Sequence, residues 1–213
     1  MGLSHDPPPR SFAIIPAAGE SRRMGCPKLL LPWGDRTVIE TVIRSWQQSN
    51  VTHIIAVVAT DDDSPLAETC RRMEIDVEDV SPRPADMKAS IAAGMARILR
   101  DYDPRIEDAC LIAPADIPQL SVTVIDALLA AHDPQRPQPI SPVFEGHRGH
   151  PLLLPWRLAA EIAQLGPNEG IRALLDCHPP RLLEVDDPDV VAADLDTPET
   201  YRRLHDQHQR KNR

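Results

Sequence analysis

FAIIPAAGESRRMGCPK, residues 12–28, joins a short apolar run to a polar loop of small and basic residues. The run from Phe12 to Ala17 predicts a buried strand, because it is short, apolar and bounded by a glycine-containing turn. The loop then follows at the carboxyl end of that strand. Open α/β sheets bind their ligands at this end of their strands, so the sequence predicts a ligand site over residues 17–28.

The loop offers two kinds of group that bind anions. Its Ala-Ala-Gly start, residues 17–19, lets the backbone approach a ligand closely and presents N–H donors to it. Three cations follow within seven residues, namely Arg22, Arg23 and Lys28. The spacing is neither that of a P-loop, in which lysine directly follows the second glycine, nor that of a GxGxxG fingerprint. We predict phosphate binding here; the alternative is an ordinary βα turn with solvated arginines.

Strand-like and helix-like patterns alternate along the chain outward from this loop. Residues 54–59 are continuously apolar, as expected of a strand buried on both faces, whereas residues 37–48 place apolar side chains at helical spacing. The same reasoning predicts strands over 75–80 and 109–113 and helices over 65–73, 91–99 and 122–129. This alternation is typical of an α/β fold with a mostly parallel central sheet covered by helices.

The chain is expected to form one domain over residues 11–206. Residues 1–10 are interpreted as a flexible leader and residues 207–213 as a frayed tail, and the proline-rich connection 133–142 lies inside the domain. Beyond that connection the patterns predict four strands, over residues 140–144, 151–154, 181–185 and 192–195. They also predict three helices, over 157–164, over 169–176 and from Thr197-Pro198 onward.

Composition excludes several classes of function. The 213 residues carry 32 acidic and 23 basic side chains and a formal charge of -9, which disfavours binding to nucleic acid or to an anionic membrane. Four widely spaced cysteines are interpreted as reduced thiols. No signal peptide and no apolar run of transmembrane length is evident. We therefore expect a cytoplasmic protein with no nucleic-acid or membrane partner.

Two acidic segments are candidates for metal binding. Asp116 lies in PADIP, a proline-stiffened loop after the predicted strand 109–113, and suits Mg²⁺, which takes one or two protein carboxylates; it could instead be a turn aspartate that caps local N–H groups. Strand alternation predicts that Asp194 and Asp196 share a face, so that either could be a second metal ligand. Asp196 or Thr197 could equally be only a helix cap.

Two further segments could line a substrate pocket. Asp86 to Ser90 begins a predicted helix, whose free N–H groups could meet a phosphate or could form a routine helix start. His147 and His150 flank Arg148 in a glycine turn. The pair lacks the further ligands that zinc requires, so these side chains are interpreted as pocket-lining or as part of an exposed hairpin.

PAAGESRRMGCPKLLLPWG resembles the signature loop of the nucleotidyltransferases that make the dinucleotide forms of the molybdenum cofactor, broadly A-A-G-x-S-x-R-M-G-x-x-K-L-L-L-P. PADIP, GHRGHPLLL and DLDTPETY resemble later segments of that family in the same order. The likeness spans about residues 12–203. It implies a Rossmann-like three-layer α/β/α sandwich and an enzyme that moves a nucleoside monophosphate, with CMP from CTP favoured, onto a phosphorylated acceptor such as molybdopterin, releasing pyrophosphate.

The resemblance also implies roles for individual residues. Arg23 and Lys28 would act on the triphosphate as catalytic residues, and Asp116 with Asp196 would hold Mg²⁺. Other nucleotide-binding residues would be Ala17, Ala18, Gly19, Glu20, Ser21 and Ser90. Acceptor-binding residues would be Asp86, Lys88, His147, Arg148 and His150. A molybdoenzyme or maturation chaperone is a further partner that the resemblance implies.

The sequence departs from the family pattern on the acceptor side. The Gly-Met-Ser-x-Ser stretch of the family reads Asp86-Met-Lys-Ala-Ser90 here, and Pro16 is closer to the related cytidylyltransferase of isoprenoid precursor synthesis. Two alternatives therefore stay open. One is a nucleotidyltransferase for a sugar phosphate or an isoprenoid precursor, and the other is a non-catalytic nucleotide-binding cofactor chaperone.

Overall fold

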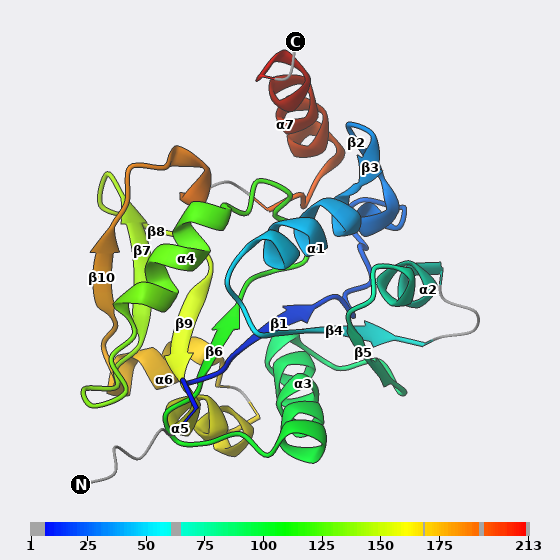
Figure 1. Ribbon diagram of the computed structural model, residues 1–213. Helices are drawn as coiled ribbons and strands as arrows, with labels where there is room; N and C mark the ends of the chain where they lie inside the picture. The colour runs from blue at the N-terminus through cyan, green and yellow to red at the C-terminus, as the bar shows by residue number, and fades with distance from the viewer. Residues whose placement is uncertain (1–6, 61–64, 168, 192–193, 212–213) are drawn as a thin grey trace, which may run out of the picture.

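A computed structural model describes residues 7–60, 65–167, 169–191 and 194–211 (Figure 1). Most of its strands join one sheet in the order β10-β7-β9-β6-β1-β4-β5, with β8 paired to β7. The strands of this sheet are β1 (Ser11–Pro16), β4 (His53–Ala59), β5 (Asp76–Val80), β6 (Ala109–Ile112), β7 (Ile140–Phe144), β8 (His147–Arg148), β9 (Leu152–Pro155) and β10 (Arg181–Glu184). A separate hairpin joins β2 (Pro32–Trp33) to β3 (Arg36–Thr37).

The sheet is mostly parallel, as the alternation of patterns predicts. β1 pairs in parallel with β4 and β6, β4 with β5, and β10 with β7. β9 is antiparallel to both β6 and β7, because the chain reverses through β8 before it enters β9. The carboxyl ends of β1, β4, β5 and β6 therefore meet at one edge of the sheet, where the loop after β1 lies.

Helices cover both faces of the sheet, which gives three layers (Figure 1). The α-helices are α1 (Val38–Gln48), α2 (Pro65–Arg72), α3 (Met87–Tyr102), α4 (Val122–Ala131), α5 (Trp156–Ala159), α6 (Ile171–Cys177) and α7 (Pro198–Lys211). Short 3-10 helices are η1 (Lys28–Leu30), η2 (Ala160–Gln164) and η3 (Pro188–Val191). α1, α2 and α4 lie on one face, and α3, α5 and α6 lie on the other. This arrangement confirms the predicted three-layer α/β/α fold.

Two apolar clusters, one on each face, hold the layers together. Alternation along β1 sends Ala13 and Ile15 into the cluster under α1 and α4, and sends Phe12 and Ile14 into the cluster over α3. All four side chains are fully buried. Such burial on both faces is why the central strands are short continuous apolar runs.

The helices beside the loop begin at well-formed caps. α1 starts at a capping box, in which Glu40 N donates to Thr37 Oγ1 over 3.4 Å and Thr37 N donates to Glu40 Oε2 over 2.8 Å. α3 approaches the sheet closely at Gly94, where an added Cβ would lie 2.9 Å from Ile14 Cγ2. The capping box fixes the start of α1, and the close approach at Gly94 holds the middle of α3 against β1.

Several expected boundaries differ from the structure. Asp194 and Leu195 are not in a strand: Asp196 N donates to Asp194 O over 2.9 Å, which is a tight turn, and residues 192–193 lie outside the described part. The prediction that alternation along a strand puts Asp194 and Asp196 on one face is therefore wrong. The helix expected over 157–164 is divided between α5 and η2, because the chain tightens to 3-10 geometry after Ala159.

The expected leader and tail are partly structured. Arg105 donates to the carbonyls of Pro7 and Pro8 over 2.9 and 2.7 Å, while residues 1–6 lie outside the described part. α7 continues to Lys211, so residues 207–211 of the expected tail are helical. No helix within the described ranges combines the length and the apolar composition that a bilayer span needs.

The proline-rich connection 133–142 leads straight into β7. Ile140 begins that strand and shares one apolar cluster with Leu128 of α4 and Leu111 of β6. In the described part of the chain, the core is therefore continuous across the connection.

Candidate active site

The loop over residues 17–27 turns sharply at the carboxyl end of β1. Ala17 N donates to Val57 O over 2.8 Å, and Met24 N donates to Ser21 O over 2.9 Å. Gly25 has φ +66°, which favours glycine because side chains rarely adopt that conformation. An added Cβ at Gly19 would meet no atom within 4 Å. The backbone at Gly19 is thus open to a ligand, whereas Ala17 and Ala18 are only 3% exposed.

Lys28 follows the loop and meets two carboxylates from distant parts of the chain. Its ammonium donates to Asp116 Oδ2 and, over 3.1 Å, to Asp196 Oδ1. The side chains of Lys28 and Asp116 are 15% and 11% exposed, whereas Asp196 is 34% exposed. Burial alone would lower the pKa of Lys28, but the two carboxylates outweigh it and raise that pKa. Lys28 is therefore a charged ammonium at neutral pH.

Arg23 completes this cluster from the solvent side. Its guanidinium lies 2.9 Å from Asp196 Oδ2, and its side chain is 71% exposed. Because an exposed ion pair of this kind is weak, about 0–1 kcal/mol, Arg23 is available to a phosphate. The two cations that the resemblance assigns to the triphosphate thus lie side by side.

The carboxylates of Asp116 and Asp196 both contact the Lys28 ammonium. Their oxygens are therefore close enough together to suit one small hard metal ion. Across the described ranges, no group of three histidine, cysteine or acidic side chains gathers as a metal cluster. Mg²⁺ accepts such a site, because it binds one or two carboxylates and completes its octahedron with water and phosphate oxygens. A backbone hydrogen bond from Leu195 N to Asp116 O, at 3.3 Å, joins the two acidic segments.

Asp194 lies beside this pair but does not contact Lys28. It belongs to the rim of the site and is exposed overall. Partial burial of its carboxyl and the negative charges of Asp116 and Asp196 raise the pKa of Asp194 to about 6. Asp196 is the member of the Asp194/Asp196 pair that shares the Lys28 ammonium with Asp116. Thr197 takes the capping role, since Thr200 N donates to its Oγ1 over 3.2 Å at the start of α7.

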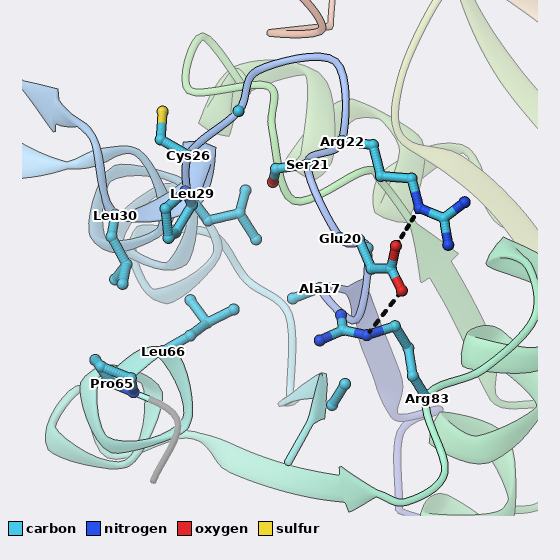
Figure 2. Close-up of a pocket in the computed structure, with 14 residues that line it drawn as sticks. Ala17, Glu20, Ser21, Arg22, Cys26, Leu29, Leu30, Pro65, Leu66 and Arg83 are labelled. Carbon is cyan, nitrogen blue, oxygen red and sulfur yellow. Dashed lines mark hydrogen bonds and ion pairs between the residues drawn. The ribbon is translucent and has the colours of Figure 1, made fainter. Parts of the chain in front are cut away.

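Two cavities open on either side of the loop. The larger has a volume of about 630 Å³ and reaches Lys28, Asp196 and the start of α3 at Asp86 and Ser90. The smaller, of about 450 Å³, has an apolar wall of Leu29, Leu30, Pro65 and Leu66 (Figure 2). Both volumes fall in the range of small-molecule sites. The cavities share the residues Gly19, Glu20, Ser21, Arg22 and Arg83.

Arg83 is a site residue that the sequence analysis missed. Its guanidinium donates to the carbonyl of Ala18 and lies 3.8 Å from Glu20, which also pairs with Arg22 (Figure 2). The pairing with Arg22 is the main cause that lowers the pKa of Glu20. Arg83 stands between two prolines after β5, at the same sheet edge as the loop. A lone basic residue at that edge is the signal that could have revealed it.

The residues expected to bind the acceptor lie in three places. Asp86 caps α3 by accepting from Ala89 N over 2.8 Å and lines the larger cavity with Ser90. Lys88 points elsewhere, toward the carbonyl of Gly166. His147 and Arg148 are exposed on β8 and line neither of the two cavities.

His150 lies closer to the carboxylate pair than its neighbours in the hairpin do. Its N–H donates to Val190 O over 3.1 Å, and an added Cβ at Gly149 would collide with the same carbonyl. Burial lowers the pKa of His150, and the negative charge of Asp116 opposes that shift in part. His150 is therefore a neutral imidazole beside Asp116 at pH 7.

The chain is similar to curated proteins over most of its length. It is 22% identical over 188 residues to the molybdenum cofactor cytidylyltransferase of Escherichia coli (strain K12), with 88% of this chain and 92% of that protein covered. It is 25% identical over 201 residues to nicotine blue oxidoreductase of Paenarthrobacter nicotinovorans, with 90% and 94% covered.

Solved structures share the fold. A nucleotidyl transferase of Methanothermobacter thermautotroptrophicus has a TM-score of 0.76 and 23% identity, with 95% of this chain and 99% of that chain covered. The Rv0371c protein of Mycobacterium tuberculosis H37Rv, solved with manganese, has a TM-score of 0.70 and 24% identity, with 92% and 98% covered.

The family itself is shown by the sequence profile of the MobA-like NTP transferase domain, which matches residues 13–185. That match includes the loop after β1, Lys28 and Asp116, and it ends before Asp196. It confirms the resemblance on which the expected fold and enzyme class rest. This chain therefore belongs to the MobA-like NTP transferase domain family and is a nucleotidyltransferase.

Proposed function

We propose that this protein transfers CMP from CTP to a phosphorylated acceptor of the molybdopterin type and releases pyrophosphate. The observation that carries the proposal is the Lys28 ammonium held between Asp116 and Asp196 beneath an open, basic loop. A nucleoside triphosphate needs cations for its phosphates and carboxylates for its metal ion, and this edge of the sheet supplies both.

The loop would bind the nucleotide mainly through its backbone. The N–H groups of Ala18 and Gly19 lie at the open carboxyl end of β1, where they can meet phosphate or ribose oxygens, whereas the N–H of Ala17 already donates to Val57 O. Arg23 and Lys28 would hold the triphosphate, together with the exposed Arg22. Ser21 and Ser90 add hydroxyls to the larger cavity.

Asp116 and Asp196 would hold Mg²⁺, which when bound neutralises phosphate charge and acts as a Lewis acid. Rv0371c of the same fold has been solved with manganese, which supports the use of a divalent cation. Lys28 has three N–H donors, and two of them meet the carboxylates in this structure. With those oxygens engaged by a metal ion, Lys28 would be free to donate to phosphate oxygens.

The reaction would be a direct in-line displacement. A phosphate oxygen of the acceptor forms a bond to the α-phosphorus of CTP, the bond from that phosphorus to the bridging oxygen breaks, and pyrophosphate leaves. Both reactants are anions, so Arg23 and Lys28 lower the barrier by neutralising charge and by holding the phosphates in line. In this mechanism no side chain forms a covalent bond to the substrate.

The cytidine and molybdopterin preferences rest on relatives. The molybdenum cofactor cytidylyltransferase is similar along most of the chain, and the same fold occurs in a CMP:2-keto-3-deoxy-manno-octonic acid synthetase complexed with CTP. Asp86, which lines the larger cavity, and His150, whose pKa is influenced by the charge of Asp116, would lie on the acceptor side. A cytoplasmic location and contact with a molybdoenzyme or maturation chaperone belong to the same proposal.

Pyrophosphate release tests the proposal. Purified protein, CTP, Mg²⁺ and molybdopterin should give pyrophosphate, and omission of either molybdopterin or Mg²⁺ should abolish it. Release only with a sugar phosphate or an isoprenoid-precursor phosphate would favour the related transferases instead. Tight CTP binding without release for any of these acceptors would favour a nucleotide-binding chaperone.

A further inference from the structure

Asp196 depends on α7 for its position, and α7 has little apolar surface of its own. The carboxylate lies two residues before the helix begins at Pro198. Leu204 is the one buried residue along the described length of α7. On the other side of Asp196, Leu195 is fully buried and donates to Asp116 O over 3.3 Å, so α7 fixes Asp196 from its C-terminal side.

The helix is attached chiefly through a ring cluster, which we define as Trp33, Tyr201, His205 and His208. From the Trp33 ring, centroid distances are 5.2 Å to His208, 5.7 Å to His205 and 6.3 Å to Tyr201. Tyr201 stacks on His205 with an interplanar angle of 15°. Trp33 is 1% exposed, so the helix covers a large apolar ring that would otherwise meet water.

Tyr201 adds a directed bond to this cluster. Its hydroxyl donates to Pro32 O over 2.6 Å. Another polar attachment of α7, from Lys211 to Asp189 at 3.0 Å, involves a lysine that is 63% exposed. Exposed ion pairs contribute little; the Tyr201 hydrogen bond is exposed too, but it joins α7 to Pro32, next to the buried Trp33.

The ring cluster and the carboxylate pair contact the same short segment of chain. Residues 28–33 run from Lys28, which binds Asp196, to Trp33, which the rings of α7 cover. Figure 1 shows α7 standing beside the β2–β3 hairpin that begins with this segment. α7 and the turn before it thus hold the segment at both ends, and the second contact limits how far Asp196 can move from Lys28 and Asp116.

We propose that Tyr201 is a positioning residue that holds the Asp196 carboxylate in place and thereby sets the affinity of the site for a divalent cation. Tyr201 does so by fastening α7 to Pro32. The proposal rests on the metal role that the proposed function gives Asp196. Side chains that orient metal ligands from behind commonly tune metal affinity in this way.

Mn²⁺ binding tests the proposal without any need for activity. The full-length protein and its variants are titrated with Mn²⁺ alone, with binding followed by calorimetry or by the electron paramagnetic resonance of the free ion. Tyr201→Phe should weaken Mn²⁺ binding about 3- to 10-fold, the effect of losing one hydrogen bond. Asp196→Asn should weaken it further.

Tyr102→Phe is a matched control, because it removes the hydroxyl of the chain's other tyrosine. That hydroxyl donates to Asp76, at the far end of α3 from the site. Tyr102→Phe should bind Mn²⁺ as the wild type does, even if its melting temperature falls as much as that of Tyr201→Phe.

Three results would overturn the proposal, and they differ in whether the proposed function survives. Unchanged Mn²⁺ affinity in Tyr201→Phe, beside a defect in Asp196→Asn, refutes the positioning role and leaves the proposed function intact. An equal loss in Tyr102→Phe shows a general effect of stability and refutes it too. If the wild type and Asp196→Asn bind Mn²⁺ equally, or neither binds it, the metal role of Asp196 fails and the positioning role fails with it.

Discussion

Replacing Lys28 with alanine should move metal binding and catalysis in opposite directions. In the structure the Lys28 ammonium sits where the oxygens of Asp116 and Asp196 converge, so it competes with Mg²⁺ for the same negative charge. Without the ammonium, the two carboxylates repel each other and attract a divalent cation more strongly. Under the proposed function, the same change also removes a donor to the triphosphate in the transition state.

The magnitudes follow from burial. Removing one partner of a buried ion pair costs 3–5 kcal/mol, and the lower figure of about 3 kcal/mol suits a cluster in which Asp196 is 34% exposed. Loss of one transition-state donor lowers turnover by about 10²-fold or more. The variant should therefore be less stable than the wild type without metal, recover more stability on adding Mg²⁺, and still turn over poorly.

Urea unfolding with and without Mg²⁺ measures the first two effects, and pyrophosphate release from CTP measures the third. Arg36→Ala is a suitable control, since Arg36 pairs only with an exposed neighbour, Asp35, in the contacts described. The reasoning is refuted if Lys28→Ala gains no more stability from Mg²⁺ than the wild type does. Near-normal turnover of the variant would remove Lys28 from the mechanism.

Three further changes test other parts of the site and the fold. Asp116→Asn should abolish Mg²⁺-dependent pyrophosphate release at ordinary Mg²⁺ concentrations; activity unchanged from that of the wild type across a Mg²⁺ titration would contradict a role as metal ligand. Arg83→Ala should free the Ala18 carbonyl and raise the KM for CTP about 10-fold, the effect of one hydrogen bond to a charged group, and steady-state kinetics that show an unchanged KM would contradict this. Asp108→Ala should lower the free energy of unfolding, measured in urea at pH 7, by about 3 kcal/mol, because the fully buried Asp108 carboxylate binds Arg10 and Arg105. Burial would raise the pKa of Asp108, but hydrogen bonds from those two residues lower it below the usual 3.8. Its stabilisation is therefore present above pH 3.8 and is lost as the pH falls through the lowered pKa, so wild type and variant should converge in strong acid.

Local sequence was enough to predict the parts of the site that lie in one segment. The strand, the glycine turn and the cations of residues 12–28 are consecutive, and Asp116 directly follows a strand whose apolar run is unmistakable. Their positions at one sheet edge then follow from the parallel topology. This is why the predicted fold agrees with the structure and why Lys28 and Asp116 lie at the same edge of the sheet.

Residues placed by tertiary contacts could not be predicted in the same way. The strand expected over 192–195 was inferred from alternation, but Asp194 and Asp196 are joined by a backbone hydrogen bond within a turn. Lys88 follows a helix cap that faces the site, yet its long side chain reaches Gly166 instead. Arg83 acts on a carbonyl 65 positions earlier in the chain. None of these contacts produces a periodic pattern in the sequence.

Because β9 is antiparallel to β6, one border of the candidate site lies in a turn outside the parallel strands. Because β9 runs opposite to β6, Leu152 pairs with Ile112, and the residues just before β9 border the loop that follows β6. The hairpin thus delivers His150 beside Asp116 without any help from the parallel strands. Insertions over residues 145–148 would change that border while leaving the loop after β1 untouched, whereas Gly149 has no room for a side chain, because an added Cβ would collide with Val190 O. Under the proposed function, an enzyme of this design can change its acceptor through this one peripheral turn.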